Sequence, residues 1–235
     1  MSQPSGESLA QRLPDLPRWV EARALLLSGD GEVLAVQDDP ALALVVWDAD
    51  THTAFVIGRP SLAALPAILQ NKAPVREVIT AWEQAAWLAG ALPGWARSRI
   101  IVHQLVEPAR LPEAPAGRVG FLDPARLSEL TLPADLREEL ESGAAGSRIA
   151  AAFVAGQPVS FCYAGAVTET LWDISIDTVP EHRRQGLAAL CVAHMIRHML
   201  AEGKRPVWQA ARLASGRGEP GFLAAGAEAR LRAGG

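Results

Sequence analysis

Two consecutive stretches decide the fold: Leu171-Trp172-Asp173-Ile174-Ser175-Ile176-Asp177-Thr178 and the basic turn Arg183-Arg184-Gln185-Gly186-Leu187-Ala188. Apolar and polar residues alternate along 171–178, which is typical of a half-buried β-strand. Residues 187–202 carry an apolar stripe at helical spacing, and Gly203 is suited to end a helix there. We therefore expect a strand, a tight turn and a helix in this order.

The turn is suited to bind an anion such as a pyrophosphate. A helix N-terminus presents backbone N–H groups without intrahelical partners and carries a partial positive charge. Gly186 lets the backbone approach a ligand closely, and Arg183 and Arg184 add cations for phosphate oxygens. The alternative interpretation is an ordinary strand–helix junction with surface arginines.

At these residues the sequence resembles the GNAT superfamily of acyl-CoA-dependent N-acyltransferases. Arg183-x-x-Gly186-x-Ala188 matches the Arg/Gln-x-x-Gly-x-Gly/Ala motif of that family. A six-residue motif occurs often by chance, but the strand before it, the helix after it and a further strand expected at 205–210 make the match more specific. The resemblance covers about residues 140–210.

The resemblance implies an α/β fold with a mixed α+β sheet. A GNAT-like acyl-CoA N-acyltransferase unit is expected at 117–235, behind an additional N-terminal α/β unit at 1–113. The linker between them is expected at 111–117, which contains two prolines and a glycine. Because strands precede helices in the N-terminal unit too, a degenerate GNAT-like domain is a further interpretation of it.

The remaining pattern predicts the elements of each unit. Residues 1–17 are expected to form a loose tail or a partly docked arm. In the N-terminal unit we expect strands at 22–28, 32–37, 42–48, 53–58 and 99–106, and helices at 62–70 and 75–92. In the C-terminal unit we expect helices at 123–130 and 132–140, strands at 148–155 and 158–166, and a last strand or hairpin at 222–231.

The resemblance also implies acetyl-CoA as co-substrate, bound in a gap between two splayed strands. The backbone of Ile176 and Thr178 is expected to pair with the pantetheine amides. The backbone from Gln185 to Ala188, with both arginines, is expected to hold the pyrophosphate. The implied cofactor-binding set is Ile176, Asp177, Thr178, Arg183, Arg184, Gln185, Gly186, Leu187 and Ala188.

The implied reaction is direct attack of an amine on the thioester, which needs a base near the thioester carbon. Asp173 is the first candidate and Glu169, just upstream, is the second. The alternative is that these carboxylates are solvated positions of an amphipathic strand. The family's usual tyrosine acid is missing, because the only tyrosine is Tyr163 on the preceding strand.

Composition limits the classes of protein that remain. The chain has 235 residues, 49% of them hydrophobic and 20% charged, with a net charge of −4. These values are typical of a globular protein and argue against nucleic acid as a partner. Without an apolar run of membrane-spanning length or a signal-like N-terminus, a cytoplasmic protein is expected.

No metal is expected, because His194 and His198 lack a third ligand, and Cys162 and Cys191 are expected to be buried thiols. The favoured function is transfer of an acetyl group from acetyl-CoA to a primary amine of a small molecule, amino acid or peptide. The alternative is a catalytically impaired acyl-CoA-binding or interaction protein on a GNAT scaffold. The N-terminal unit is a candidate for shaping the acceptor site or for a homodimer contact.

Overall fold

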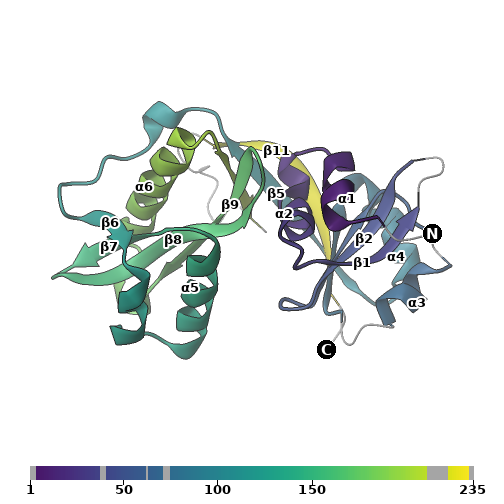
Figure 1. Ribbon diagram of the computed structural model, residues 1–235, viewed down its shortest axis with the longest axis horizontal. Coiled ribbons are helices and arrows are strands. Elements are labelled where there is room, and N and C mark those ends of the chain that lie inside the picture. The colour runs from purple at the N-terminus through teal and green to yellow at the C-terminus, as the bar shows by residue number, and fades with distance from the viewer. Residues whose placement is uncertain (1–3, 38–40, 62, 71–74, 211–221, 233–235) are drawn as a thin grey trace. The chain divides into compact units, whose positions relative to one another are not determined.

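The structure is a computed structural model that describes residues 4–37, 41–61, 63–70, 75–210 and 222–232. It divides into two compact units, shown in Figure 1. Among these residues, the first unit comprises 4–103, 209–210 and 224–232, and the second comprises 104–208 and 222–223.

This division differs from the predicted boundary at 113–117 in two ways. The first changeover falls between His103 and Gln104, within strand β5 (Ala96–Leu105). Most of the last strand, β11 (Phe222–Arg232), joins the first unit, because it pairs antiparallel with β4 (Glu77–Ala81). Pairing between segments so far apart in sequence has no local signal.

The first unit begins with helices α1 (Gly6–Arg12) and α2 (Val20–Ser28), joined by a 3-10 turn. Its strands lie in the order β1-β2-β3-β4-β11-β5. Strands β1 to β3 form an antiparallel meander, and β3 runs parallel to β4. The other elements are β1 (Glu32–Gln37), β2 (Ala43–Asp48), β3 (Thr53–Ile57), α3 (Leu65–Gln70) and α4 (Ala85–Ala91).

Two predictions for the N-terminal unit are wrong. Residues 22–28 form part of helix α2, because the uninterrupted apolar run 24–27 has no period that separates strand from helix. Of the two alternatives for the N-terminal segment, the structure agrees with the docked arm, because the segment contains α1, whose Leu9 is fully buried against α2 and the sheet. Buried Arg23 of α2 holds this segment by donating hydrogen bonds to the carbonyl oxygens of Ala10 and Leu13.

The second wrong prediction is the helix at 75–92. The segment instead contains β4, a 3-10 turn and the short helix α4. Strand β4 lies between β3 and β11 and is buried along 78–81. A strand buried on both faces is apolar at consecutive positions, and such a run can imitate a helical stripe. The strands predicted at 32–37, 42–48, 53–58 and 99–106 are confirmed as β1, β2, β3 and β5.

The second unit has the strand order β10-β9-β8-β7-β6. Its elements are β6 (Val119–Leu122), a 3-10 helix (Pro124–Glu129), α5 (Ala134–Gly146), β7 (Ile149–Val154), β8 (Gln157–Val167), β9 (Leu171–Thr178), α6 (Leu187–Ala201) and β10 (Arg205–Ala210). Strands β6 to β9 are antiparallel, and β9 and β10 are parallel. The predicted strand, turn, helix and strand at 171–210 are confirmed, and β6 was not predicted.

The two helices of the second unit cover opposite faces of its sheet (Figure 1). Along β8, Phe161 and Tyr163 belong to the core beneath α5, whereas Cys162 and Ala164 belong to the core beneath α6. Helix α5 continues past its predicted end at Leu140 and includes Gly143. Because Gly143 has no side chain, the helix backbone approaches the ring of Tyr163 closely there.

The first unit repeats the organisation of the second. In each unit two helical segments precede three antiparallel strands, a crossover helix and a strand parallel to the third. This shared order supports the interpretation of the N-terminal unit as a second GNAT-like domain. Within the described ranges, no helix is both long and apolar enough to cross a membrane.

Candidate functional site

Strands β9 and β10 are paired at one end and separate toward the other. Their register covers three residue pairs, from Arg205↔Leu171 to Val207↔Asp173. Strand β9 continues to Thr178, and among the residues described no β9–β10 pair follows Asp173. The edge of β9 from Ile174 onward is therefore not covered by β10, and its backbone polar groups there require other partners.

The corresponding strands of the first unit stay together. Strands β3 and β4 pair from Thr53↔Glu77 to Val56↔Thr80, which is nearly the whole of β3. The Thr80 hydroxyl donates a further hydrogen bond of 2.7 Å to the Val56 carbonyl oxygen. The gap between β9 and β10 thus has no counterpart between β3 and β4.

The turn after β9 leaves the N-terminus of α6 open. Gly186 is the N-cap residue, has a φ of 77° and provides no side-chain cap. A methyl group placed on its Cα would meet no protein atom within 4 Å. Arg184 also adopts a left-handed conformation, with a φ of 62°. The first N–H groups of α6 therefore face open space, as an anion site requires.

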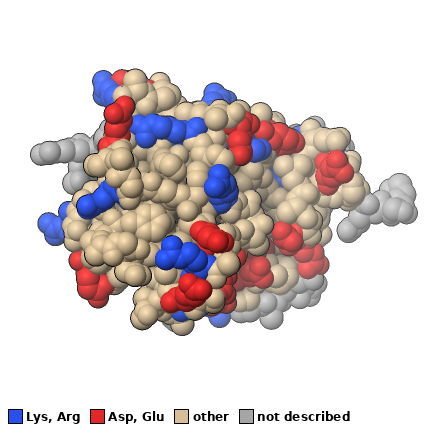
Figure 2. Space-filling view, turned by 60° about the vertical axis from the view of Figure 1, so that its left-hand side comes forward, with Lys and Arg blue, Asp and Glu red and all other residues tan. Residues whose placement is uncertain are grey.

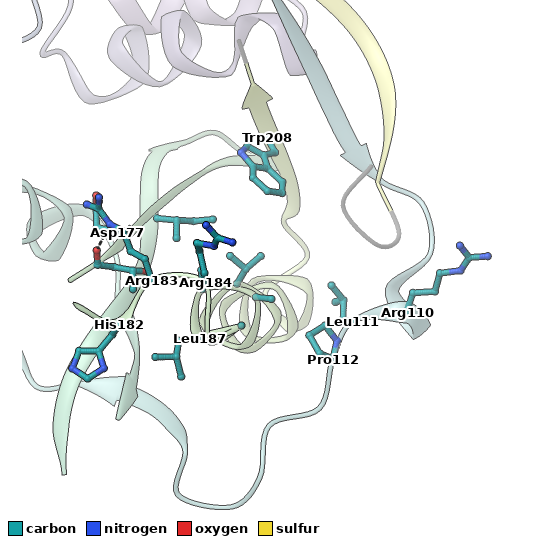
Figure 3. A pocket seen from close by; sticks show the side chains of 15 residues that line it. Arg110, Leu111, Pro112, Asp177, His182, Arg183, Arg184, Leu187 and Trp208 are labelled. Atoms are coloured by element: carbon teal, nitrogen blue, oxygen red, sulfur yellow. Dashed lines mark hydrogen bonds between the residues drawn. The ribbon is translucent and has the colours of Figure 1, made fainter. Parts of the chain in front are cut away.

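A cavity of about 790 Å³ extends from this turn to the separated strands (Figure 3). Its walls are residues 176–178 of β9, the basic turn, the first turns of α6, Trp208 of β10 and residues 110–112. All of these belong to the second unit. The volume lies in the range of small-molecule sites in proteins, about 300–1,000 Å³.

All predicted cofactor-binding residues except Gln185 line this cavity. The amide of Gln185 instead donates to the carbonyl oxygen of Glu181, at 3.3 Å. Arg183 donates from Nε to the Thr178 carbonyl oxygen at 3.0 Å, so it also fixes the end of β9. Arg184 extends into the centre of the cavity in Figure 3.

Sequence reasoning missed the wall contributed by the segment 110–112 and by Trp208. Arg197 of α6 holds this segment in place, because its guanidinium donates to the carbonyl oxygens of Leu111 at 3.1 Å and Pro112 at 3.0 Å. The prolines near 112 were interpreted only as a linker. The apolar character of Leu111, which is 8% exposed, was the one local signal of packing.

The structure separates the two candidate bases. Asp173 occupies the last β9–β10 pair, where the strands begin to diverge. Beside it, β8 has a bulge at Gly165, and a Cβ there would lie 3.8 Å from the Asp173 carboxylate and 2.6 Å from the Ser175 hydroxyl. Glu169 is exposed in the turn before β9, beyond the paired segment, and its carbonyl oxygen accepts a hydrogen bond from Lys204. Neither candidate base lines the cavity, and of the two Asp173 lies nearer to it along β9.

Asp177 connects the cavity with a group of ionisable side chains beneath α5. The Tyr163 hydroxyl donates to the Asp177 carboxylate at 3.4 Å, and Glu139 of α5 lies beside both. Burial raises the pKa values of Asp177, Glu139 and Tyr163, and repulsion between the two carboxylates adds to the rise for Glu139. Ionisable groups with shifted pKa values are frequent next to functional sites.

Two histidines of α6 pack against Phe121, and both cysteines of this unit are buried in its core. The rings of His194 and His198 lie 4.7 and 4.8 Å from the ring of Phe121, and burial lowers the pKa of His194. Cys162 and Cys191 are buried free thiols, as predicted. In the part of the chain that the structure describes, no three His, Cys, Asp or Glu side chains come together as metal ligands.

Charge on the surface is mixed. Over the face shown in Figure 2, basic and acidic side chains are interspersed among larger uncharged areas. The chain as a whole carries a net charge of −4.

Residues 144–217 match the GNAT acetyltransferase family, and this segment contains β9, the basic turn, α6 and β10. The match lies in the C-terminal half of the chain and supports a GNAT superfamily member. This match supports acyltransferase activity in general. The sequence shows no significant similarity to a curated protein.

Solved structures share the fold over almost the whole chain. A GCN5-related N-acetyltransferase-like protein from Streptococcus suis is 17% identical, with 95% of each chain covered and a TM-score of 0.65. A GCN5-related N-acetyltransferase from Kribbella flavida is 17% identical, with 95% of this chain and 97% of that chain covered and a TM-score of 0.60. At this identity the likeness concerns the fold alone, and it includes the N-terminal unit.

Proposed function

We propose that this GNAT protein is an N-acetyltransferase that moves an acetyl group from acetyl-CoA to a primary amine of a small molecule, amino acid or peptide. One observation carries the proposal: a single cavity joins the open N-terminus of α6 to the gap between β9 and β10. An elongated cofactor with phosphates at one end and a reactive group at the other suits this shape.

The phosphates would lie at the basic turn. The N–H groups at Gly186 and beyond have no side-chain cap, and the helix dipole favours negative charge there. Arg184 lines the cavity without an ion pair among the described residues, so its guanidinium is free to bind phosphate. The Nε of Arg183 donates to the Thr178 carbonyl oxygen, which leaves the two terminal nitrogens of the guanidinium for the ligand.

The pantetheine arm would follow the uncovered edge of β9. Its amides can exchange hydrogen bonds with the backbone of residues 176–178, as a short added strand does. This arrangement directs the thioester toward the end of the gap, where β9 and β10 meet at Asp173 and Val207.

Asp173 is the proposed base. The acceptor amine forms a bond to the thioester carbonyl carbon and loses a proton to Asp173, directly or through water. The carbon–sulfur bond then breaks, and the CoA thiolate leaves and takes up a proton. At the β8 bulge, Gly165 lets the Ser175 hydroxyl and the Asp173 carboxylate pack close to the backbone, which holds the Asp173 side chain beside the neighbouring strand.

A catalytically impaired acyl-CoA-binding protein is the second candidate. The observation that favours it is the position of Tyr163, the only tyrosine, whose hydroxyl is engaged with Asp177 beneath α5. No tyrosine is then left to protonate the leaving thiolate. A thiolate is a stable leaving group, however, so water can serve as the proton source.

Release of free CoA from acetyl-CoA, measured with a thiol reagent across a panel of primary amines, tests the proposal. Asp173→Asn is expected to lower kcat about 10²- to 10⁴-fold. The matched control Glu169→Gln removes a carboxylate from the same segment and is expected to retain activity. Binding of acetyl-CoA without release of CoA with any amine would favour the second candidate. Equal loss in both variants would refute the assignment of Asp173.

A further inference from the structure

We propose that Trp208 closes the acyl end of the cavity and restricts the cofactor to short acyl groups. This inference rests on the proposed function, because it concerns the group that the cofactor carries. It assigns a specificity-determining role to a side chain outside the GNAT motif.

The position of Trp208 in the sheet carries the inference. Val207 forms the last β9–β10 pair with Asp173, so Trp208 is the first residue of β10 in the separated part. Its indole lines the cavity and is the largest side chain to do so. Figure 3 shows it projecting from β10 toward α6.

The distance from the turn fits this role. Trp208 follows the pair at Asp173, so it lies near the level of Ile174 in β9. A strand rises about 3.3 Å per residue, so Ile174 and Thr178 are about 13 Å apart along β9. A cofactor whose phosphates lie at the turn and whose arm runs back along β9 thus presents its thioester close to the indole.

The packing of Trp208 opposes its displacement by a longer acyl group. The indole packs against the apolar core beneath α6, together with Ile176, Leu187 and Val192. An acetyl group adds only two carbons and fits beside the ring. A longer chain must displace the indole from this core, which removes buried apolar contacts.

Titration of CoA and of acetyl-, butanoyl-, hexanoyl- and octanoyl-CoA, by calorimetry, tests the inference. For the wild type, affinity is expected to fall once the acyl group exceeds about four carbons. In Trp208→Ala, each methylene that enters the vacated space is expected to raise affinity by up to about fourfold, the equivalent of ~0.8 kcal/mol. Trp208→Leu keeps apolar packing and is expected to give an intermediate profile.

Trp87→Ala is the matched control, because it truncates a partly buried tryptophan in α4 of the first unit. It is expected to keep the wild-type order of acyl-CoA affinities. Equal binding of acetyl- and octanoyl-CoA by the wild type, or parallel profiles for wild type and both Trp208 variants, would overturn the inference alone. Absence of binding to CoA itself would overturn the proposed function as well.

Discussion

Arg184 combines a strained backbone with a side chain suited to the ligand, and the two properties can be separated by substitution. Its φ of 62° lies in the left-handed region, which costs a residue with a Cβ about 1–2 kcal/mol. Its side chain extends into the cavity. Arg184→Gly removes the cation and the backbone cost, whereas Arg184→Ala removes the cation and keeps the cost.

The two variants should therefore agree in affinity and differ in stability. Loss of a charge-assisted hydrogen bond, about 1.5–3 kcal/mol, should weaken CoA binding roughly 10- to 150-fold in both. Glycine also has more conformational freedom in the unfolded chain, which lowers the unfolding free energy by about 0.5–1 kcal/mol and offsets part of the relieved strain. The Gly variant should thus exceed the Ala variant by about 0.5–1 kcal/mol in unfolding free energy.

Calorimetric titration with CoA gives the affinities, and thermal melting without ligand gives the stabilities. For a chain of this size, a gain of that order corresponds to about 1–4 °C in Tm. Wild-type affinity in both variants would refute the role of Arg184 at the phosphates. A Gly variant no more stable than the Ala variant would refute the assignment of strain.

Three further predictions concern stability and the cavity wall. Gly143→Ala should lower the unfolding free energy by about 1–3 kcal/mol in urea titrations, because the new methyl group would collide with the Tyr163 ring; an unchanged midpoint would contradict the packing. Burial raises the pKa of Glu21 to about 7, so its ionisation opposes folding, and wild-type stability should fall as pH rises from about 4.5 to about 7. Glu21→Gln should therefore raise Tm at pH 8 and leave it nearly unchanged at pH 4.5, and the reverse pattern would contradict the sign. Arg197→Ala should weaken CoA binding several-fold in calorimetry, because the segment at Leu111 loses two hydrogen bonds. Unaltered affinity would contradict a contact between this segment and the ligand.

The part of the fold that the sequence predicts is the part with local signals. Residues 171–203 combine strict alternation, a turn motif and a helical stripe, and the structure confirms all three. Strand β4 has no such signal. Its neighbours β3 and β11 lie about 20 and 150 residues away, and because residues 78–81 are all buried, apolar and polar side chains do not alternate along it.

The candidate site, too, was predicted where its residues are neighbours in the sequence and missed where they are not. The motif residues from Arg183 to Ala188 were predicted because a single turn contains them, and all but Gln185 line the cavity. Trp208 and Leu111 were missed, because packing against α6 brings them to the cavity from separate segments. The gap itself could not be derived from the sequence, since it depends on where the register of β9 and β10 stops.

Calorimetric titration of CoA into the wild type, Gly186→Trp and Gly94→Trp tests the central claim most directly. Both glycines have a positive φ and open space in front of the Cα, so the backbone strain is matched, but Gly94 lies in the first unit outside the cavity. The account predicts micromolar binding by the wild type and by Gly94→Trp, and loss of binding in Gly186→Trp, whose indole would occupy the phosphate position. Binding by a folded Gly186→Trp with wild-type affinity, or no binding by the wild type, would contradict the account.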